Sequence, residues 1–443
     1  MIMWYNVTII SNMRVEQMKI KTVEMRYEDV LTLPAAVHEK PIRQSIFFRT
    51  LLKVLSCIDL MRVGFTCSKI GMEKLSADEP CLVLMNHSSF IDLEIASSVL
   101  FPRSFHIVCT QDGFVGKKWL MRNLGCIPTK KFITDVALVR DMVYTVKELK
   151  SSILMYPEAS YSFDGTATPL PESLGKCLKL LKIPVVMIRT RGAYLRDPLY
   201  NGLQIRNVKV SAEMEYLLSP EEIGEKSVEE LNQILQSQFS FDHFKWQQEN
   251  RVCIDEPFRA DGLNRVLYKC PNCGGEGKML GKGVKIACGL CKKEYELTEY
   301  GFLKAEEGTT EFSHIPDWYK WERECVKKEL TDGTYRMELP VAIYMLVNTK
   351  CAYRVGTGIL SHTKDGFHLT GCDGKLDYRQ DPLSSYSLYS DFYWYEIGDM
   401  ISIGNEKVQY YCFPKNHENI VAKARLAAEE LYKLRKKQTK CAD

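Results

Sequence analysis

The sequence lacks an export signal and a long apolar segment, and it has little net charge. The N-terminus has no basic region, extended apolar core or small-residue cleavage site of the secretory kind. No run of 18 or more apolar residues occurs, so we expect no membrane-spanning helix. The formal net charge is only +3, which gives no global field for a polyanion, and we expect no nucleic-acid partner. These absences predict a cytoplasmic protein, with any membrane contact being peripheral on the cytoplasmic face.

The length and composition predict a globular chain of several folded units. At about 100–200 residues per domain, 443 residues correspond to two or three units. Hydrophobic residues make up 45% and charged residues 26%, which is typical of folded protein rather than of disordered chain. From changes in composition we assign residues 1–40 to an N-terminal segment of unknown role, 41–245 to an α/β domain, 268–300 to a cysteine-rich unit, 316–330 to a helical linker and 335–437 to a small β domain.

The α/β assignment rests on alternation of apolar runs with helix-like segments. Residues 81–85, 152–156 and 183–188 are short apolar runs of the kind found in buried strands. Strands that alternate with helices predict a mostly parallel sheet.

The C-terminal part is aromatic and β-branched, and turn signals interrupt it. Lys364-Asp365-Gly366 and Gly404-Asn405 are such signals. A stripe of apolar residues between Glu418 and Lys437 predicts a closing helix. We therefore expect a mainly-β domain closed by a helix, an architecture that resembles a pleckstrin-homology-like or GRAM-like barrel.

An amphipathic helix is predicted between Pro41 and Val63. Apolar residues recur there at spacings of mostly three and four, and basic residues accompany them. The pattern fits a helix packed on the next domain, and it fits equally a helix that lies on an anionic membrane surface. The sequence leaves both open.

A histidine and an aspartate follow the first apolar run of the α/β domain. The segment Asn86-His87-Ser88-Ser89-Phe90-Ile91-Asp92 stands between a predicted strand and a predicted helix. On one continuous helix, residues five apart are rotated by about 140°, so His87 and Asp92 would point to different faces. A turn between strand and helix allows the carboxylate to orient the imidazole and leaves the other ring nitrogen as a base. The alternative is that His87 caps the helix and Asp92 lies in its first turn.

Four segments in order resemble the phospholipid/glycerol acyltransferase family, which includes lysophosphatidate acyltransferases. Asn86 to Asp92 resembles the first block of that family, and Gly125 to Lys131 and Tyr156-Pro157-Glu158-Ala159-Ser160 resemble the second and third. Ile183 to Val186 is similar to the fourth. The resemblance covers roughly Ile42 to Asn232. Ala159 stands where the family has glycine, and Tyr161 stands where arginine often follows.

The resemblance implies an acyltransferase that uses an acyl-coenzyme A or acyl carrier protein thioester. It implies His87 as the general base, Asp92 as its orienting group, and Lys131, Glu158, Ala159 and Ser160 as binding residues for a lysophosphatidate-like acceptor. Lys131 stands where the family has arginine, and this change, together with those at Ala159 and Tyr161, keeps another lipid alcohol open as the acceptor. A membrane surface is an expected partner.

Two paired cysteine motifs predict a structural zinc site. Cys270-Pro271-Asn272-Cys273 and Cys288-Gly289-Leu290-Cys291 are separated by fourteen residues. Two such knuckles present four thiolates to one ion, and a closed four-cysteine shell is typical of a structural zinc ribbon. A redox dithiol and four unrelated cysteines are the alternatives. Because more than a third of the chain lies outside the family resemblance, a non-catalytic adaptor that acts through the ribbon and the β domain is a further hypothesis.

Overall fold

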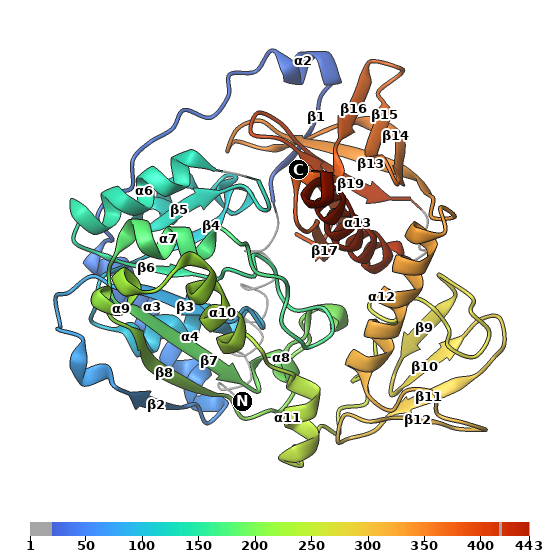
Figure 1. Cartoon of the computed structure of the whole chain (residues 1–443), viewed down its shortest axis with the longest axis horizontal. Helices are drawn as coiled ribbons and strands as arrows, with labels where there is room; N and C mark the ends of the chain where they lie inside the picture. The colour runs from blue at the N-terminus through green and yellow to red at the C-terminus, as the bar shows by residue number, and fades with distance from the viewer. Residues whose placement is uncertain (1–19, 134, 416–418, 443) are drawn as a thin grey trace, which may run out of the picture.

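The computed structural model describes residues 20–133, 135–415 and 419–442, which form three sheets with helices around them (Figure 1). The first 19 residues of the predicted N-terminal segment, and Glu418, where we expected the last helix to begin, lie outside the described residues.

The α/β part contains a seven-stranded sheet in the order β2-β8-β7-β3-β6-β4-β5. Every neighbouring pair is parallel except β7 and β8, which run antiparallel. The sheet is therefore mixed, with a single departure from the parallel arrangement that the sequence predicts. Its strands are β2 (Thr66–Ile70), β3 (Leu82–Met85), β4 (Phe105–Thr110), β5 (Cys126–Thr129), β6 (Ser152–Met155), β7 (Val185–Arg191) and β8 (Ser211–Leu218).

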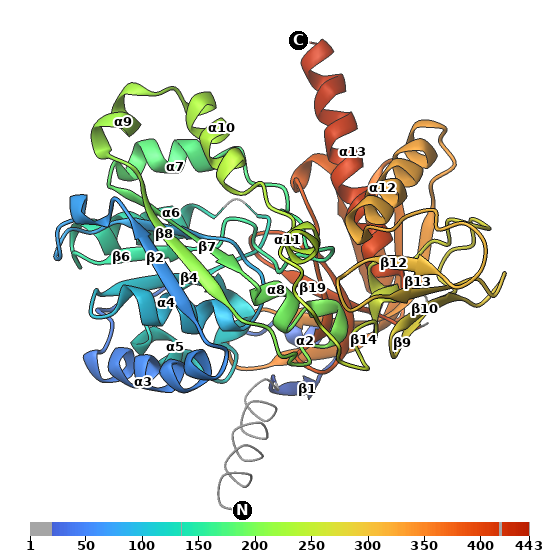
Figure 2. The ribbon, with the colours of Figure 1, turned by 90° about the horizontal axis from the view of Figure 1, so that it is seen from below.

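Helices cover both faces of this sheet (Figure 2). The residues of β3 alternate between the two layers, as strand geometry requires: Val83 packs with the cluster that holds Ile95, and Leu84 packs with the cluster that holds Leu178. Both faces of the strand are consequently apolar and buried. The helices are α3 (Ile46–Arg62), α4 (Ile91–Leu100), α5 (Lys118–Asn123), α6 (Val136–Lys147), α7 (Leu174–Leu181), α8 (Ala193–Arg196), α9 (Pro220–Glu225), α10 (Val228–Gln238) and α11 (His243–Glu249).

The cysteine-rich unit forms an antiparallel sheet of four short strands in the order β12-β11-β10-β9. Its strands are β9 (Met279–Lys282), β10 (Lys285–Cys288), β11 (Glu294–Leu297) and β12 (Leu303–Ala305). The helix α12 (Ile315–Thr331) follows and leads to the C-terminal part.

The C-terminal part is a mainly-β domain with strand order β16-β15-β14-β13-β19-β18-β17. The predicted turn residues lie at hairpins: Asp365 separates β14 from β15, and Asn405 separates β18 from β19. Residues from the N-terminal segment join this sheet, because β1 (Thr22–Glu24) pairs in parallel with β14. The elements are α2 (Tyr27–Leu31), β13 (Met337–Leu346), β14 (Ala352–Thr363), β15 (Gly366–Gly371), β16 (Leu376–Gln380), β17 (Tyr389–Trp394), β18 (Gly398–Gly404), β19 (Gln409–Pro414) and α13 (Ile420–Ala442).

One apolar cluster joins the three parts of the chain. It includes Phe163 and Tyr200 from the α/β part, Tyr295 from the cysteine-rich unit, and Val341 and Leu426 from the C-terminal part. All of these side chains are buried. The β domain is therefore packed on the α/β part, and its strand β17 lies against it.

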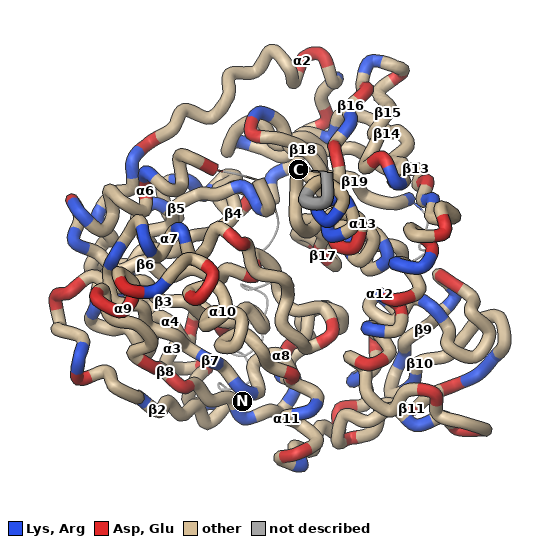
Figure 3. The backbone as a smooth tube through the Cα atoms, viewed as in Figure 1, with Lys and Arg blue, Asp and Glu red and all other residues tan. Residues whose placement is uncertain are grey.

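The charges agree with a chain that has no single-sign field. Lys and Arg are interspersed with Asp and Glu over all three parts (Figure 3). None of the helices in the described ranges is both long and apolar enough to cross a bilayer.

Candidate functional site

A buried asparagine fixes the end of strand β3, where the site begins. The side-chain oxygen of Asn86 accepts the backbone N–H of Thr190 on β7 at 2.8 Å. Its amide nitrogen donates to the hydroxyl of Ser88 at 2.8 Å. A short polar turn thus links β3 to α4 and presents His87 at the carboxyl end of the strand.

His87 and Asp92 meet across this turn. Nδ1 of His87 lies 3.1 Å from Oδ2 of Asp92. The same oxygen accepts the backbone N–H groups of Ser88 at 2.7 Å and Ser89 at 3.1 Å. Asp92 is 1% exposed, and three donors therefore hold its Oδ2 in one place. The turn inferred from the spacing is present, and it gives the imidazole one orientation.

The second nitrogen of His87 is directed to open space. The His87 side chain is 22% exposed, and within the described ranges its Nε2 has no hydrogen-bond partner. Burial, together with the positive charge of Lys131, lowers the pKa of His87 below its ordinary value. The imidazole is accordingly neutral at pH 7 and able to accept a proton at Nε2.

Two tyrosines enclose the imidazole. The ring of Tyr156 stacks on His87 with 4.2 Å between centroids, and Tyr161 contacts its other side at 4.2 Å. Burial raises the pKa of both phenols, so both stay protonated at neutral pH. Sequence reasoning noticed Tyr161 only as a departure from arginine. The contact shows that this residue confines the ring.

The predicted binding residues Glu158, Ala159 and Ser160 lie beside His87 but face different ways. Glu158 is fully buried, and its two oxygens accept the backbone N–H groups of His87 at 2.8 Å and Thr168 at 2.9 Å. These are the contacts of a group that positions the backbone of His87. The Ser160 hydroxyl accepts a hydrogen bond from Arg425 of α13 at 3.1 Å. The substrate-binding roles of all three stay predictions.

Ala159 adopts a left-handed backbone conformation, with φ of 57°. This conformation costs a non-glycine residue about 1–2 kcal/mol. Glycine avoids that cost, but its unfolded chain has more conformational freedom, which lowers folding stability by about 0.5–1 kcal/mol. We expect Ala159→Gly to stabilise the protein by about 0.5–1 kcal/mol and to raise Tm by about 0.5–1 °C. Differential scanning calorimetry measures the shift, and a fall in Tm would contradict this account of the turn.

Lys131 lies near His87, on the loop after β5. Its ammonium is 4.1 Å from the ring centroid of Tyr389, a residue of β17 in the C-terminal domain. Burial lowers the pKa of Lys131, and the nearby carboxylates Asp391 and Asp112 oppose that change. The lysine charge is therefore set by residues from both parts of the chain.

Two cavities meet at His87. The first, of about 800 Å³, has many aliphatic side chains, among them Leu93, Val139 and Met142. The second, of about 650 Å³, is lined by polar and aromatic side chains. The residues that border both are His87, Phe90, Thr110, Lys131 and Tyr161. The free nitrogen of His87 consequently lies where an apolar chain from one side could meet a polar group from the other.

Strand β17 forms one wall of the second cavity. The sequence did not predict that the C-terminal domain contributes to the site. Tyr389 donates its hydroxyl to Asp112 at 2.5 Å, and Nε1 of Trp394 donates to the same carboxylate at 2.9 Å. Asp112 belongs to the short 3₁₀ helix Gln111–Phe114 that follows β4, so these buried bonds fasten the β domain to the α/β part. The only advance signal was the aromatic content of the segment, which says nothing about its partner.

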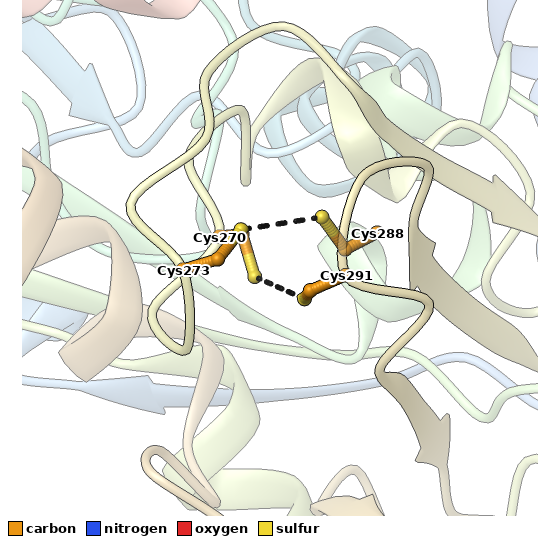
Figure 4. A group of neighbouring side chains, drawn as sticks. All are labelled: Cys270, Cys273, Cys288 and Cys291. Atoms are coloured by element: carbon orange, nitrogen blue, oxygen red, sulfur yellow. Dashed lines mark hydrogen bonds between the residues drawn. The ribbon is translucent and has the colours of Figure 1, made fainter.

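The four paired cysteines come together (Figure 4). Their sulfur atoms all lie within 4.8 Å of one another. Cys270 and Cys291 are 3.7 Å apart at Sγ, as are Cys273 and Cys288. Zinc bound tetrahedrally about 2.3 Å from each sulfur places neighbouring sulfurs about 3.8 Å apart. The spacing of the thiols fits that ion.

Comparison with known proteins points to one family for the region that contains His87. Residues 67–190 match the family model described as Acyltransferase. Over 127 residues the chain is 28% identical to the chloroplastic 1-acyl-sn-glycerol-3-phosphate acyltransferase BAT2 of Brassica napus. This alignment covers 28% of this chain and 36% of that protein. The crystal structure of the 1-acyl-sn-glycerophosphate acyltransferase PlsC from Thermotoga maritima is also similar, at 17% identity and a TM-score of 0.36. The superposition covers 43% of this chain and 76% of the PlsC chain.

The chain spans about a third of the length of the curated relative that it matches. The match includes the histidine and aspartate, Lys131 and the turn at Glu158, and it ends before the cysteine-rich unit. The resemblance inferred from four short segments is therefore confirmed over this region. Over residues 67–190 this chain is similar to the acyltransferase family.

Proposed function

We propose that the protein transfers a fatty acyl group from an acyl thioester to the hydroxyl of a lysophospholipid, with His87 as general base. The observation that carries this proposal is the junction of two cavities at a neutral, oriented imidazole inside an acyltransferase-family domain. Asp92 positions the ring, and Tyr156 and Tyr161 restrict its motion.

The reaction needs only the side chains already described. Nε2 of His87 takes the proton of the acceptor hydroxyl while the hydroxyl oxygen attacks the thioester carbonyl carbon. The carbon–sulfur bond then breaks, and the leaving thiolate receives the proton from His87. Because the acceptor itself is the nucleophile, this route forms no acyl-enzyme.

The two cavities suit the two substrates. The larger, aliphatic one fits the acyl chain of the donor, because its walls are the side chains that apolar chains prefer. The smaller, polar one fits the acceptor, with Lys131 as the cation for its phosphate and Ser160 on its wall. Glu158 acts in this scheme through the backbone of His87.

An acceptor panel tests the assignment. Purified protein is given acyl-coenzyme A or acyl carrier protein thioesters, and free thiol is measured with lysophosphatidate, other lysophospholipids or a lipid alcohol that lacks phosphate. The proposal requires thiol release that depends on an acceptor hydroxyl. Release that is equally fast with water alone would identify a thioesterase, and no release with any donor would reject acyl transfer.

The C-terminal part is proposed to serve the same enzyme. We assign zinc to Cys270, Cys273, Cys288 and Cys291, where a closed thiolate shell stabilises a small sheet with little core of its own. The two meanders β13–β16 and β17–β19, joined by the pairing of β13 with β19, and the helix α13 support the pleckstrin-homology-like assignment as an architecture. The contacts of Tyr389 and Arg425 beside His87 favour this integrated role over that of an independent adaptor.

An exposed apolar face on α3 supports peripheral membrane binding. The helix packs on α4, where Lys53 donates to Ser98 at 2.7 Å. Its other side leaves Ile46, Phe47 and Met61 70%, 68% and 73% exposed. Trp119, which is 69% exposed, contacts Phe48 with 5.6 Å between centroids and extends the same face. Amphipathic helices with this exposure bind at lipid interfaces, so we place the face on the cytoplasmic leaflet.

Replacing Phe47 tests the membrane face. Burying a phenylalanine is worth about 1.5–3 kcal/mol, so Phe47→Ser is expected to weaken binding to anionic phospholipid vesicles by roughly tenfold or more. Cosedimentation measures the partition. Leu280→Ser is the matched control, because Leu280 is 61% exposed but lies on β9 of the cysteine-rich unit. Equal binding by both variants would exclude this face.

A further inference from the structure

The polar cavity contains a cation and an anion that come from different parts of the chain. Lys131 follows β5, and Asp391 lies on β17, yet both line the cavity of about 650 Å³ next to His87. Each alters the other's pKa: Asp391 raises that of Lys131, and Lys131 lowers that of Asp391. The two charged side chains therefore border one cavity.

The alternation of side chains along β17 directs Asp391 into the polar cavity. Tyr389 and Asp391 are two residues apart on the strand, so their side chains share a face. Both are in regular antiparallel register, with Tyr389 opposite Ser402 and Asp391 opposite Met400. Because Tyr389 covers the ammonium of Lys131, Asp391 faces the same space.

The other charges of this cavity already have partners. Asp112 accepts hydrogen bonds from Tyr389 and Trp394. Arg265 pairs with Asp399 at 3.3 Å and stacks over Tyr393 at 4.1 Å. By contrast, no residue in the described ranges forms a salt bridge with Lys131 or Asp391. Asp391 accepts a backbone hydrogen bond from Phe392, and Lys131 and Asp391 act on each other only at longer range, so both can still contact a ligand.

We propose that the site between Lys131 and Asp391 receives the zwitterionic headgroup of an amine-bearing lysophospholipid. The phosphodiester lies at Lys131 and the ammonium lies at Asp391, with the acceptor hydroxyl at His87. This assignment rests on the proposed acyl transfer, and it names the acceptor class.

Charge balance favours this acceptor over lysophosphatidate. A phosphate monoester carries a charge of about −1.5 to −2 at pH 7, and it would meet Lys131 with the carboxylate of Asp391 opposing it. A zwitterion places opposite charges on both residues. Burial raises the pKa of Asp391 to about 7 even though Lys131 lies nearby, and a bound ammonium would favour the ionised carboxylate.

Aromatic side chains around Asp391 add to the preference. The end of β17 contributes Phe392 to the cavity wall, and the turn after the strand contributes Tyr395. Ring faces attract ammonium groups, most strongly where water is excluded. The β domain would in this way determine which headgroup the enzyme accepts.

The test compares three acceptors in the full-length protein. Lysophosphatidylethanolamine carries the ammonium, lysophosphatidylglycerol has a headgroup of similar size without it, and lysophosphatidate has a bare phosphate. We expect kcat/KM for the first to exceed that for either of the others by at least about tenfold, the effect of one lost charged contact. Asp391→Asn should remove that preference, whereas Lys131→Met should lower all three values. Asp365→Asn, an exposed change elsewhere in the β domain, is the control.

Binding separates a failure of this assignment from a failure of the proposed function. Calorimetry uses the same acceptors with the reactive hydroxyl methylated, which cannot be acylated. Tighter binding of the ethanolamine compound, lost in Asp391→Asn, supports the headgroup site even if no acyl transfer is found. A selectivity that is the same in wild type and Asp391→Asn, or a wild-type preference for lysophosphatidate, overturns it.

Discussion

Replacing His87 with alanine is expected to lower kcat/KM for acyl transfer by about 10²–10⁴-fold, the usual contribution of a general base. The acceptor hydroxyl would lose the group that takes its proton, while both cavities would stay in place. Initial rates of thiol release with a fixed thioester and lysophospholipid measure the change. A loss of more than about 150-fold is too large to come from altered acceptor binding through one charged contact.

His87 also packs between Tyr156 and Tyr161, so the variant must be shown to fold. His87→Gln keeps a planar polar group between the two rings and should lose activity to the same extent. His368→Ala is the matched control, because His368 also faces a carboxylate, Asp377 at 2.9 Å, but lies on β15. A His87 variant that folds and keeps activity within tenfold of wild type would disprove the base assignment.

Replacing Cys270 with serine is expected to remove zinc and to unfold the cysteine-rich unit. Fresh wild-type protein should contain about one equivalent of zinc, because four thiolates fill a single tetrahedral shell. The strands β9 to β12 are short, and the apolar cluster that includes Ile286 and Tyr295 continues into the rest of the chain. Loss of the ion should therefore destabilise the protein by about 4–5 kcal/mol or more.

Metal analysis and thermal unfolding measure the two effects together. Cys253→Ser is the matched control, since Cys253 is an exposed thiol close in sequence but outside the cluster. The Cys253→Ser variant should retain its zinc, and its Tm should equal that of wild type. Less than about half an equivalent of zinc in wild type, with an unchanged Tm in Cys270→Ser, would rule out a structural metal.

The parts of the site that could be predicted are encoded locally. Asn86 to Asp92 holds a strand end, a turn and a helix start in seven residues, so its spacing alone restricts how His87 and Asp92 meet. The paired cysteines are similar, because each knuckle forms from four consecutive residues. Alternating apolar runs likewise indicated the α/β part, although the antiparallel pair β7 and β8 has no distinct local signature.

The missed parts depend on contacts between distant segments. Asp112 is fastened by Tyr389 and Trp394, which lie more than 250 residues further along the chain, and no periodicity marks such a pairing. The side chain of Glu158 points to the backbone of His87 because that buried amide needs an acceptor, a demand that only the folded structure reveals. Strand β1 joins the C-terminal sheet from the opposite end of the sequence, which is again a contact between distant segments.

The most direct test of the account follows a labelled acyl chain to its destination. Wild-type protein is incubated with a deuterated acyl thioester and a lysophospholipid, and mass spectrometry of the lipids and of the intact protein is recorded. The account predicts one labelled diacyl phospholipid for each thiol released, no acyl adduct on the protein, and no labelled product with His87→Ala. Labelled free fatty acid as the main product, or the same diacyl product from His87→Ala, would contradict it.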